Sequence, residues 1–263
     1  MQPNKDFILS TSNLSIGYTT KKRRTIVAKN INLDINEGEL IGLVGANGVG
    51  KSTLLRTLSN LQKPLSGSIS LKGKSIKDYL PIEMAKAMSL VLTEQLMSKN
   101  LTVFELIAIG RQPYTNWIGK LSKEDQIAVG RAIELTNIEQ LQQKKCYELS
   151  DGQMQKVLIA RALAQDTEII ILDEPTTHLD LYHKAYILKL LQKLTKDTRK
   201  TILFSSHEID LTIQLCDTMA VMTEDKVYTN SPCKLIKNGV FESLFPKDLI
   251  DFDLTTGSFR FNK

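Results

Sequence analysis

The sequence predicts an α/β fold with a mostly parallel sheet. Short apolar runs alternate along the chain with segments of helical periodicity, which is the pattern of parallel strands joined by helical crossovers. Two loops are distinctive. Residues 45–53 are rich in glycine and lie between an apolar run and a helix-like run, and the apolar run 169–172 is followed by two acidic residues. Open α/β sheets bind their ligands at such strand ends.

Partial apolar alternation predicts strands on both sides of the glycine-rich loop. The expected strands and hairpin lie at residues 7–18, 25–35, 39–44, 68–74 and 88–92. A helix is expected over residues 53–61, because Pro64 and Gly67 follow it. We expect the first strands to form an N-terminal antiparallel β subdomain, and the run 39–44 to lead into the loop.

Between Leu96 and Glu148, apolar residues recur at helical spacing and strand signals are few, which predicts an all-helical insertion. Ser150 and Gln153 form a capping box at the start of a helix that extends to Ala164. The other expected elements are helices over 103–109, 123–136, 181–196 and 208–215, strands over 168–172 and 200–205, and a hairpin over 219–229. We expect a single domain whose core spans about residues 1–95 and 165–230, with an insertion at about 96–164 and a C-terminal appendage at about 231–263.

Length and composition are those of an ordinary globular protein. The chain has 263 residues, of which 42% are hydrophobic, and a formal net charge of +5. Its basic cluster at residues 21–24 lies between two predicted strands, which favours a solvated hairpin tip over a nucleic-acid or lipid contact. The three cysteines lack metal-ligand spacing, the first residues lack a signal-peptide pattern, and no apolar run approaches the roughly 20 residues of a membrane span. We therefore expect a cytoplasmic protein whose membrane role, if any, comes through a partner.

The glycine-rich segment predicts a phosphate-binding loop. Its sequence is Gly45-Ala46-Asn47-Gly48-Val49-Gly50-Lys51-Ser52-Thr53. The glycines let successive backbone N–H groups point into one anion-sized concavity, and the following helix adds its N-terminal N–H groups. Lys51 can reach the β- and γ-phosphates of a nucleotide, and the Ser52 hydroxyl can ligate the bridging Mg²⁺. The alternative is a glycine-rich turn with a chance lysine, which the flanking strand and helix disfavour.

The acidic pair after the run 169–172 is the second chemical feature. Asp173 can hold Mg²⁺, directly or through water. Glu174 is the candidate general base that orients and polarises an attacking water. Taken alone, the pair is equally consistent with a solvated acidic turn; together with the phosphate loop it predicts nucleotide hydrolysis.

At this point the chain resembles the ATP-binding subunits of ATP-binding-cassette (ABC) transporters. The segment Leu149-Ser150-Asp151-Gly152-Gln153 is similar to the family's signature motif, with Asp151 where glycine is more usual. The resemblance implies a P-loop NTPase (RecA-like) core and a head-to-tail homodimer that encloses two ATP molecules. Ser150, Gly152 and Gln153 of one copy would then face the phosphate loop of the other. A plain helix cap is the alternative role for the same residues.

Four further positions match the family pattern. The resemblance implies that Gln95 contacts Mg²⁺ and the attacking water, and that His207 contacts the γ-phosphate. It also implies that Asp180 crosses the dimer interface and that Tyr18 stacks on adenine. Without the family, we would interpret Gln95 as a loop residue, His207 as structural and Asp180 as a helix N-cap.

A subfamily signal lies in Gly110-Arg111-Gln112-Pro113-Tyr114 and in His178-Leu179-Asp180-Leu181. Both are similar to ATPases of importers for iron-siderophore complexes, haem and cobalamin. In that family the helical insertion docks the integral-membrane permease, which makes Arg111, Tyr114 and Trp117 candidates for the contact. A buried aromatic cluster is an equal alternative for Trp117. An extracytoplasmic binding protein and the permease would choose the cargo.

We therefore expect an ATP-hydrolysing subunit of an importer that makes no direct contact with nucleic acid. The alternatives are a soluble cassette ATPase that acts on nucleic acid and one that serves cofactor assembly. Nucleic-acid enzymes of this class usually have long coiled-coil insertions or paired cassettes, and this chain has neither. Lys51, Asp173, Glu174 and His207 are all present, so an inactive variant is disfavoured.

Overall fold

The computed structural model describes residues 7–20, 23–92, 100–116, 119–244, 250–253 and 257–261. These residues divide into two compact units, one from residues 1–79 and 201–263 and the other from residues 80–200. Each unit has its own apolar core and its own part of the candidate site. None of the described helices is long and apolar enough to cross a membrane.

The first unit begins with an antiparallel sheet, as expected. Strand β1 (Leu9–Thr19) pairs with β2 (Arg24–Ile31), β3 (Asp34–Ile35) and β5 (Ser66–Leu71), and β6 (Lys74–Ser75) pairs with β5. Leu14 and Ile16 of β1 are fully buried. The sheet therefore covers a core with one face, as its apolar alternation predicts.

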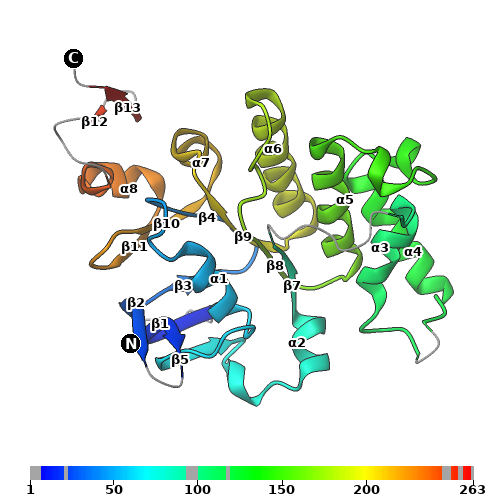
Figure 1. The fold of residues 1–263 in the computed structure, drawn as a ribbon, viewed down its shortest axis with the longest axis horizontal. Coiled ribbons are helices and arrows are strands. Elements are labelled where there is room, and N and C mark those ends of the chain that lie inside the picture. The colour runs from blue at the N-terminus through cyan, green and yellow to red at the C-terminus, as the bar shows by residue number, and fades with distance from the viewer. Residues whose placement is uncertain are drawn as a thin grey trace. The chain divides into compact units, whose positions relative to one another are not determined.

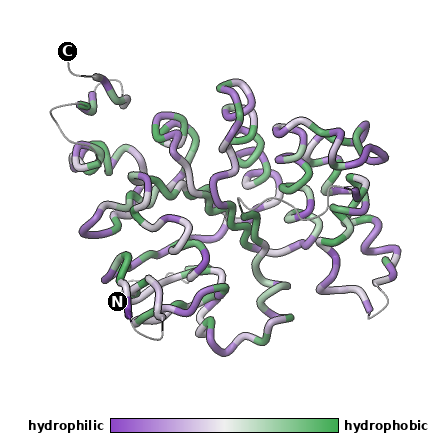
Figure 2. Tube along the Cα trace, viewed as in Figure 1, coloured by the Kyte–Doolittle hydropathy of each residue, from purple (hydrophilic) through white to green (hydrophobic). Residues whose placement is uncertain are grey.

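The parallel part of the first unit is built around β4 (Leu40–Gly45). It lies between β9 (Thr201–Ser206) and β10 (Thr218–Met222) and is parallel to both, and β11 (Val227–Asn230) adds an antiparallel edge. All residues of β4 and β9 are buried, and Figure 2 shows the tube hydrophobic along these strands. A continuous apolar run of this kind is typical of a parallel strand with both faces covered.

Two helices cover β4 from opposite sides (Figure 1). They are α1 (Lys51–Leu58) and α7 (Ile209–Leu215), and both contact β4. At Gly42 a Cβ atom would lie 2.1 Å from the methyl carbon of Thr212, so only glycine lets α7 pack this closely. Helix α1 begins two residues earlier than the predicted residue 53 and ends at Leu58, because Asn60 adopts a left-handed conformation with φ of 61°.

The C-terminal part of the first unit contains a short helix, a 3₁₀ turn and a hairpin. They are α8 (Pro232–Lys237), η5 (Phe241–Ser243), β12 (Ile250–Asp253) and β13 (Ser258–Phe261). The Phe252 ring lies 5.0 Å, centre to centre, from both the Phe241 ring and the Phe259 ring. These aromatic contacts form the packed appendage that the sequence predicts without assigning its elements.

The second unit combines two parallel strands with the helical segment. Strand β7 (Met88–Val91) pairs with β8 (Ile169–Leu172). Its described helices are α2 (Pro81–Ala87), α3 (Val103–Ala108), α4 (Lys123–Leu135), α5 (Asp151–Ala164) and α6 (Leu181–Thr198). It also contains the 3₁₀ turns η2 (Ile109–Arg111), η3 (Glu139–Leu141) and η4 (Cys146–Glu148), while η1 (Ile76–Asp78) belongs to the first unit. Helix α5 packs against α3 and α4. Sequence analysis missed α2, which buries none of its residues and so has no clear apolar face.

The fold class is confirmed, with an antiparallel N-terminal sheet, a mostly parallel sheet and a segment of packed helices. The predicted division at about residues 95, 165 and 230 stays a proposal. The compact unit 80–200 contains β7, β8 and α6 together with the helical segment.

Candidate functional site

The phosphate loop lies in the first unit, between β4 and α1. At Gly45 a Cβ atom would lie 2.3 Å from the carbonyl oxygen of Met222, so the close approach of β10 requires glycine. Gly48 and Gly50 have φ of 76° and 112°, in the left-handed region that favours glycine. Gly50 is the N-cap of α1, and among the described residues no side chain caps this helix. The first N–H groups of an α-helix have no partner within the helix, and a helix start that follows such a loop suits an anion.

Backbone carbonyl groups of the loop hold the Lys51 side chain in place. This side chain is buried, and Nζ donates hydrogen bonds to the carbonyl oxygens of Gly45 at 3.0 Å and Ala46 at 3.1 Å. A buried ammonium in a glycine-rich loop fits a site for a highly charged anion, because the loop concentrates donors and positive charge in one place. Asn47 lies in the same loop, and Ser52 is the second residue of α1.

Tyr18 lies beside this loop. Its hydroxyl oxygen is 2.7 Å from Oγ1 of Thr53, so the two hydroxyl groups share a hydrogen bond. The Tyr18 side chain is otherwise exposed. The structure thus brings the residue expected to stack on adenine together with the loop expected to bind phosphates, although they are 35 residues apart.

Replacing Lys51 with alanine should weaken ATP binding at least about tenfold, because the side chain supplies the charge-assisted donor of the loop. Fluorescence titration with a nucleotide analogue measures this change. Lys189→Ala, on an exposed position of α6, is the control and should bind as the wild type does. Unchanged affinity in Lys51→Ala would contradict the role of the loop.

His207 follows β9, the neighbour of β4 in the sheet. Val44 and Ser206 are register partners, so His207 leaves its strand at the edge where β4 enters the phosphate loop. The turn is fixed by two hydrogen bonds, from the N–H of Glu208 to Oγ of Ser206 at 2.9 Å and from the N–H of Ile209 to the His207 carbonyl at 3.1 Å. The His207 side chain is exposed. This position is compatible with contact to a terminal phosphate.

The acidic pair lies in the second unit, where β8 ends. Asp173 is buried, and its N–H donates to the carbonyl oxygen of Val91 at 2.8 Å, which extends the pairing with β7 by one residue. Glu174 has a left-handed backbone with φ of 49°. Oγ1 of Thr177 donates to its carboxylate at 3.1 Å. A non-glycine residue held in this region costs free energy, and such residues are concentrated at functional sites.

The N-terminus of α5 is a complete capping box. The Ser150 hydroxyl accepts from the N–H of Gln153 at 3.3 Å, and the Gln153 side chain accepts from the N–H of Ser150 at 3.1 Å. The predicted helix start is therefore confirmed, and both residues are oriented by each other. Asp151 follows in the first helical turn, so one carboxylate lies near the positive end of the helix dipole.

Asp180 is the N-cap of α6. Its carboxylate accepts a hydrogen bond from the backbone N–H of His183 at 2.9 Å. Nδ1 of His183 lies 2.9 Å from each of the two carboxylate oxygens of Asp180. The hydrogen bonds from the backbone and side chain of His183 lower the pKa of the Asp180 carboxyl group. The carboxylate is exposed and stays charged at neutral pH. Sequence analysis missed His183, whose only local signal was its position three residues after an N-cap.

Several predicted contacts have other outcomes. Gln95 and Trp117 lie outside the described residues. Arg111 is only 7% exposed, because its guanidinium binds Asp125 and the carbonyl oxygen of Ala164, each at 2.8 Å. Arg111 lines a pocket beside α4 but has little exposed surface, so its contact with a permease stays a prediction. Tyr114, whose ring lies 3.9 Å from the Arg111 guanidinium carbon, remains partly exposed.

The donor set fits ATP and Mg²⁺. A glycine-rich loop with a buried lysine suits phosphate oxygens, and the Ser52 hydroxyl and Asp173 carboxylate are hard oxygen ligands of the kind that Mg²⁺ prefers. These two ligands belong to different units of the chain.

Relatives that match most of the chain are named as ATP-binding proteins of transporters. An uncharacterised ABC transporter ATP-binding protein of Methanocaldococcus jannaschii is 39% identical over 96% of this chain and 86% of its own length. The probable siderophore transport system ATP-binding protein YusV of Bacillus subtilis is 37% identical, over 88% and 84%. The ferric enterobactin transport ATP-binding protein FepC of Escherichia coli is 34% identical, over 88% and 84%.

Solved structures have the same fold. CbiO1 from Clostridium perfringens, part of the ABC transporter complex CbiONQ, has a TM-score of 0.76 at 32% identity and covers 90% of this chain and 95% of its own. A dimeric ATP-binding cassette with ADP and Pi, in a post-hydrolysis state, has a TM-score of 0.73 at 27% identity and covers 85% and 98%. Residues 28–177, more than half of the chain, match the family model described as ABC transporter. With its phosphate loop and acidic strand end, the chain belongs to the ABC transporter family as an ATP-binding subunit that hydrolyses ATP.

Proposed function

We propose that this chain powers an importer of iron-siderophore complexes or of the related cargoes haem and cobalamin. The observation that carries the proposal is the match to YusV and FepC, whose names assign them to siderophore and ferric enterobactin transport. In this proposal the chain lies on the inner face of the membrane, bound to an integral-membrane permease. An extracytoplasmic binding protein delivers the cargo.

The residues of the site have defined roles in hydrolysis. The phosphate loop and Lys51 bind the β- and γ-phosphates, and Tyr18 holds the adenine. Glu174 orients the attacking water and accepts its proton, while His207 contacts the γ-phosphate. Ser52, Asp173 and Gln95 would hold Mg²⁺, which when bound neutralises charge on the phosphates.

Two copies would bind two ATP molecules head to tail. Ser150, Gly152 and Gln153 of each copy would complete the site of the other, and Asp180 would cross the interface. Support comes from the dimeric cassette among the structural neighbours. ATP would close the dimer and hydrolysis would reopen it, which moves the permease.

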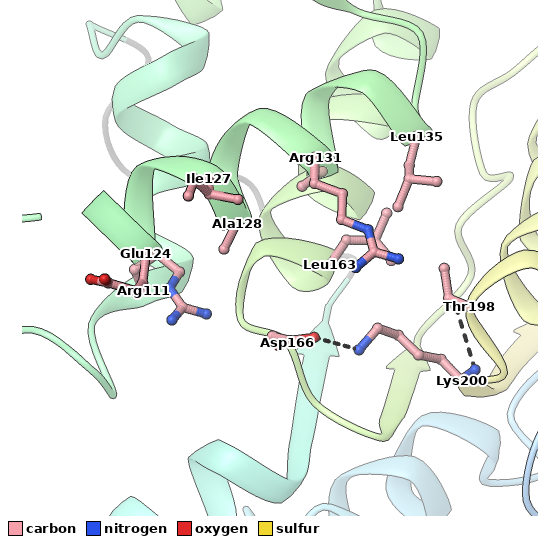
Figure 3. Close-up of a pocket in the computed structure, with 11 residues that line it drawn as sticks. Arg111, Glu124, Ile127, Ala128, Arg131, Leu135, Leu163, Asp166, Thr198 and Lys200 are labelled. Atoms are coloured by element: carbon pink, nitrogen blue, oxygen red, sulfur yellow. Dashed lines mark hydrogen bonds and ion pairs between the residues drawn. The ribbon is translucent and has the colours of Figure 1, made fainter. Parts of the chain in front are cut away.

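A pocket in the second unit suits the permease (Figure 3). It has a volume of about 340 Å³ and lies between α4, the C-terminal end of α5 and the segment after α6. Ile127 on its rim is 70% exposed, and Arg131 extends along it toward Leu163. Lys200 closes one side through a 2.9 Å ion pair with Asp166. An apolar wall beside a guanidinium fits an amphipathic cytoplasmic helix that carries an acidic residue.

The test is to purify the tagged chain from detergent-solubilised membranes of its source and to assay the same preparation for Mg²⁺-dependent ATPase activity. We expect a multi-span permease to co-purify. We also expect ATPase activity to rise when a siderophore, haem or cobalamin is added with its binding protein. Recovery only with soluble proteins or nucleic acid would support the cofactor-assembly or nucleic-acid alternative and exclude transport.

The pocket is tested by Ile127→Asp, which places a carboxylate on the apolar rim. We expect the amount of permease recovered to fall about tenfold, as for a central interface residue. Leu61→Asp is the control, because Leu61 is also apolar and 63% exposed but lies in the first unit. Equal recovery with both variants would place the docking surface elsewhere.

A further inference from the structure

His183, in the first turn of α6, contacts two segments that the proposed mechanism presents to the second copy. On one side, its N–H and its Nδ1 both bind the Asp180 carboxylate at 2.9 Å. A carboxylate only accepts hydrogen bonds, so Nδ1 carries the hydrogen and donates it. The ring orientation is therefore fixed by the residue that caps α6.

The opposite edge of the same ring lies against the first turn of α5. A Cβ atom at Gly152 would be 2.8 Å from Cδ2 of His183 and 3.5 Å from its Nε2. No side chain larger than hydrogen fits there without moving the ring. Gly152 is itself buried, so the His183 ring lies directly against the first turn of α5.

The corner around His183 is exposed and apolar. The neighbouring Leu181 and Tyr182 are each 72% exposed, and the Tyr182 ring meets the His183 ring edge to face at 5.3 Å. The His183 side chain is itself 45% exposed. Large exposed apolar residues beside a helix N-terminus suit a contact that forms only in the dimer.

We propose that His183 is a positioning residue that fixes the Asp180 loop to the N-terminus of the signature helix α5. The two parts that each copy offers to the other would then move as one body when ATP closes the dimer. This inference rests on the proposed function, because it assumes that Ser150 and Asp180 act across the interface. It adds a residue outside the phosphate loop, the acidic pair and the signature segment.

Three variants separate the two contacts of the ring. His183→Ala removes both, His183→Asn keeps a side-chain N–H near Nδ1 but loses the ring, and His183→Phe keeps the ring but loses the donor. We expect kcat for ATP hydrolysis to fall about fivefold or more in all three. The affinity of the isolated subunit for ATP should stay within about twofold of the wild type, because binding to the phosphate loop does not need the second copy.

The same variants are made with Glu174→Gln, and the ATP-bound dimer is measured by size-exclusion chromatography. We expect less dimer in all three, at unchanged thermal midpoint. If His183→Ala melts below the assay temperature, the decision rests on the Asn and Phe variants. Lys189→Ala, on an exposed position of the same helix, is the control and should match the wild type.

Wild-type kcat and dimer formation in His183→Asn would show that His183 only holds the Asp180 cap, and would overturn the inference. Wild-type values in His183→Phe would equally show that the bond to Asp180 is dispensable. Failure of the proposed head-to-tail dimer is distinct: Glu174→Gln alone, with His183 intact, would then form no ATP-bound dimer.

Discussion

Replacing Glu174 with glutamine is expected to lower ATP turnover by about 10²- to 10⁴-fold while ATP binding persists. Glutamine has nearly the same shape, and its amide oxygen can still accept the hydrogen bond from Thr177, which is 3.1 Å long in the wild type. The amide cannot accept a proton from water at neutral pH. The loop geometry should thus survive while the general base is lost.

Steady-state phosphate release and size-exclusion chromatography with ATP measure the two halves of this prediction. We expect ATP-bound dimer to accumulate, because the step that reopens it is blocked. Glu134→Gln removes a carboxylate from an exposed position of α4 and is the matched control. Turnover near the wild-type rate in Glu174→Gln would remove Glu174 from its assigned role.

Replacing Arg111 with methionine should destabilise the second unit by about 3–5 kcal/mol, the usual result of breaking a buried ion pair from one side. Arg111 and Asp125 form this pair at 2.8 Å, with side-chain exposures of 8% and 5%. Arg111 also donates to the carbonyl oxygen of Ala164 at 2.8 Å. The change leaves the Asp125 carboxylate buried without its cation and one carbonyl without its donor.

Urea unfolding followed by circular dichroism measures this loss. Arg131→Met, at an exposed position of α4, is the control and should change the free energy of unfolding by no more than about 0.5 kcal/mol. If both variants unfold at the same urea concentration as the wild type, the ion pair does not stabilise the unit.

Because the pKa of Asp125 is lowered in the folded protein, we expect the free energy of unfolding to depend on pH. The hydrogen bond from the Ser122 N–H, together with Arg111, lowers the pKa of Asp125 below its usual 3.8. A carboxyl group with a lowered folded-state pKa contributes stability that is fully present above the unfolded value and is lost as pH falls through the folded value. We expect Asp125→Asn to be less stable than the wild type at pH 7, with a smaller loss of stability below pH 3.8. An equal acid-induced loss in both proteins would contradict this assignment.

Local sequence was sufficient for the features whose physics is local. The phosphate loop depends on glycines that precede a helix, and the structure places left-handed glycines and a buried lysine there. The capping box of Ser150 and Gln153 needs only residues three apart, and it is present with both hydrogen bonds. Buried parallel strands such as β4 and β8 are recognisable as continuous apolar runs of a few residues.

Other features depend on partners far along the chain. Arg111 resembled a surface contact, yet it is buried because Asp125 and Ala164, 14 and 53 residues away, accept its hydrogen bonds. The contact of His183 with Gly152 joins two helices whose local patterns contain no trace of it. Helix α2 was missed for the opposite reason, since it buries no residue and its apolar pattern is weak.

The sequence by itself determined the α/β class, the phosphate loop, the acidic strand end and the membership in the ABC transporter family, because each depends on short runs of residues with local conformational preferences. Only the tertiary structure decided which charged side chains are buried and which are exposed, and which loops are tied together. Burial and pairing depend on chain segments distant in sequence, whose approach is set by packing of the whole unit rather than by any local pattern.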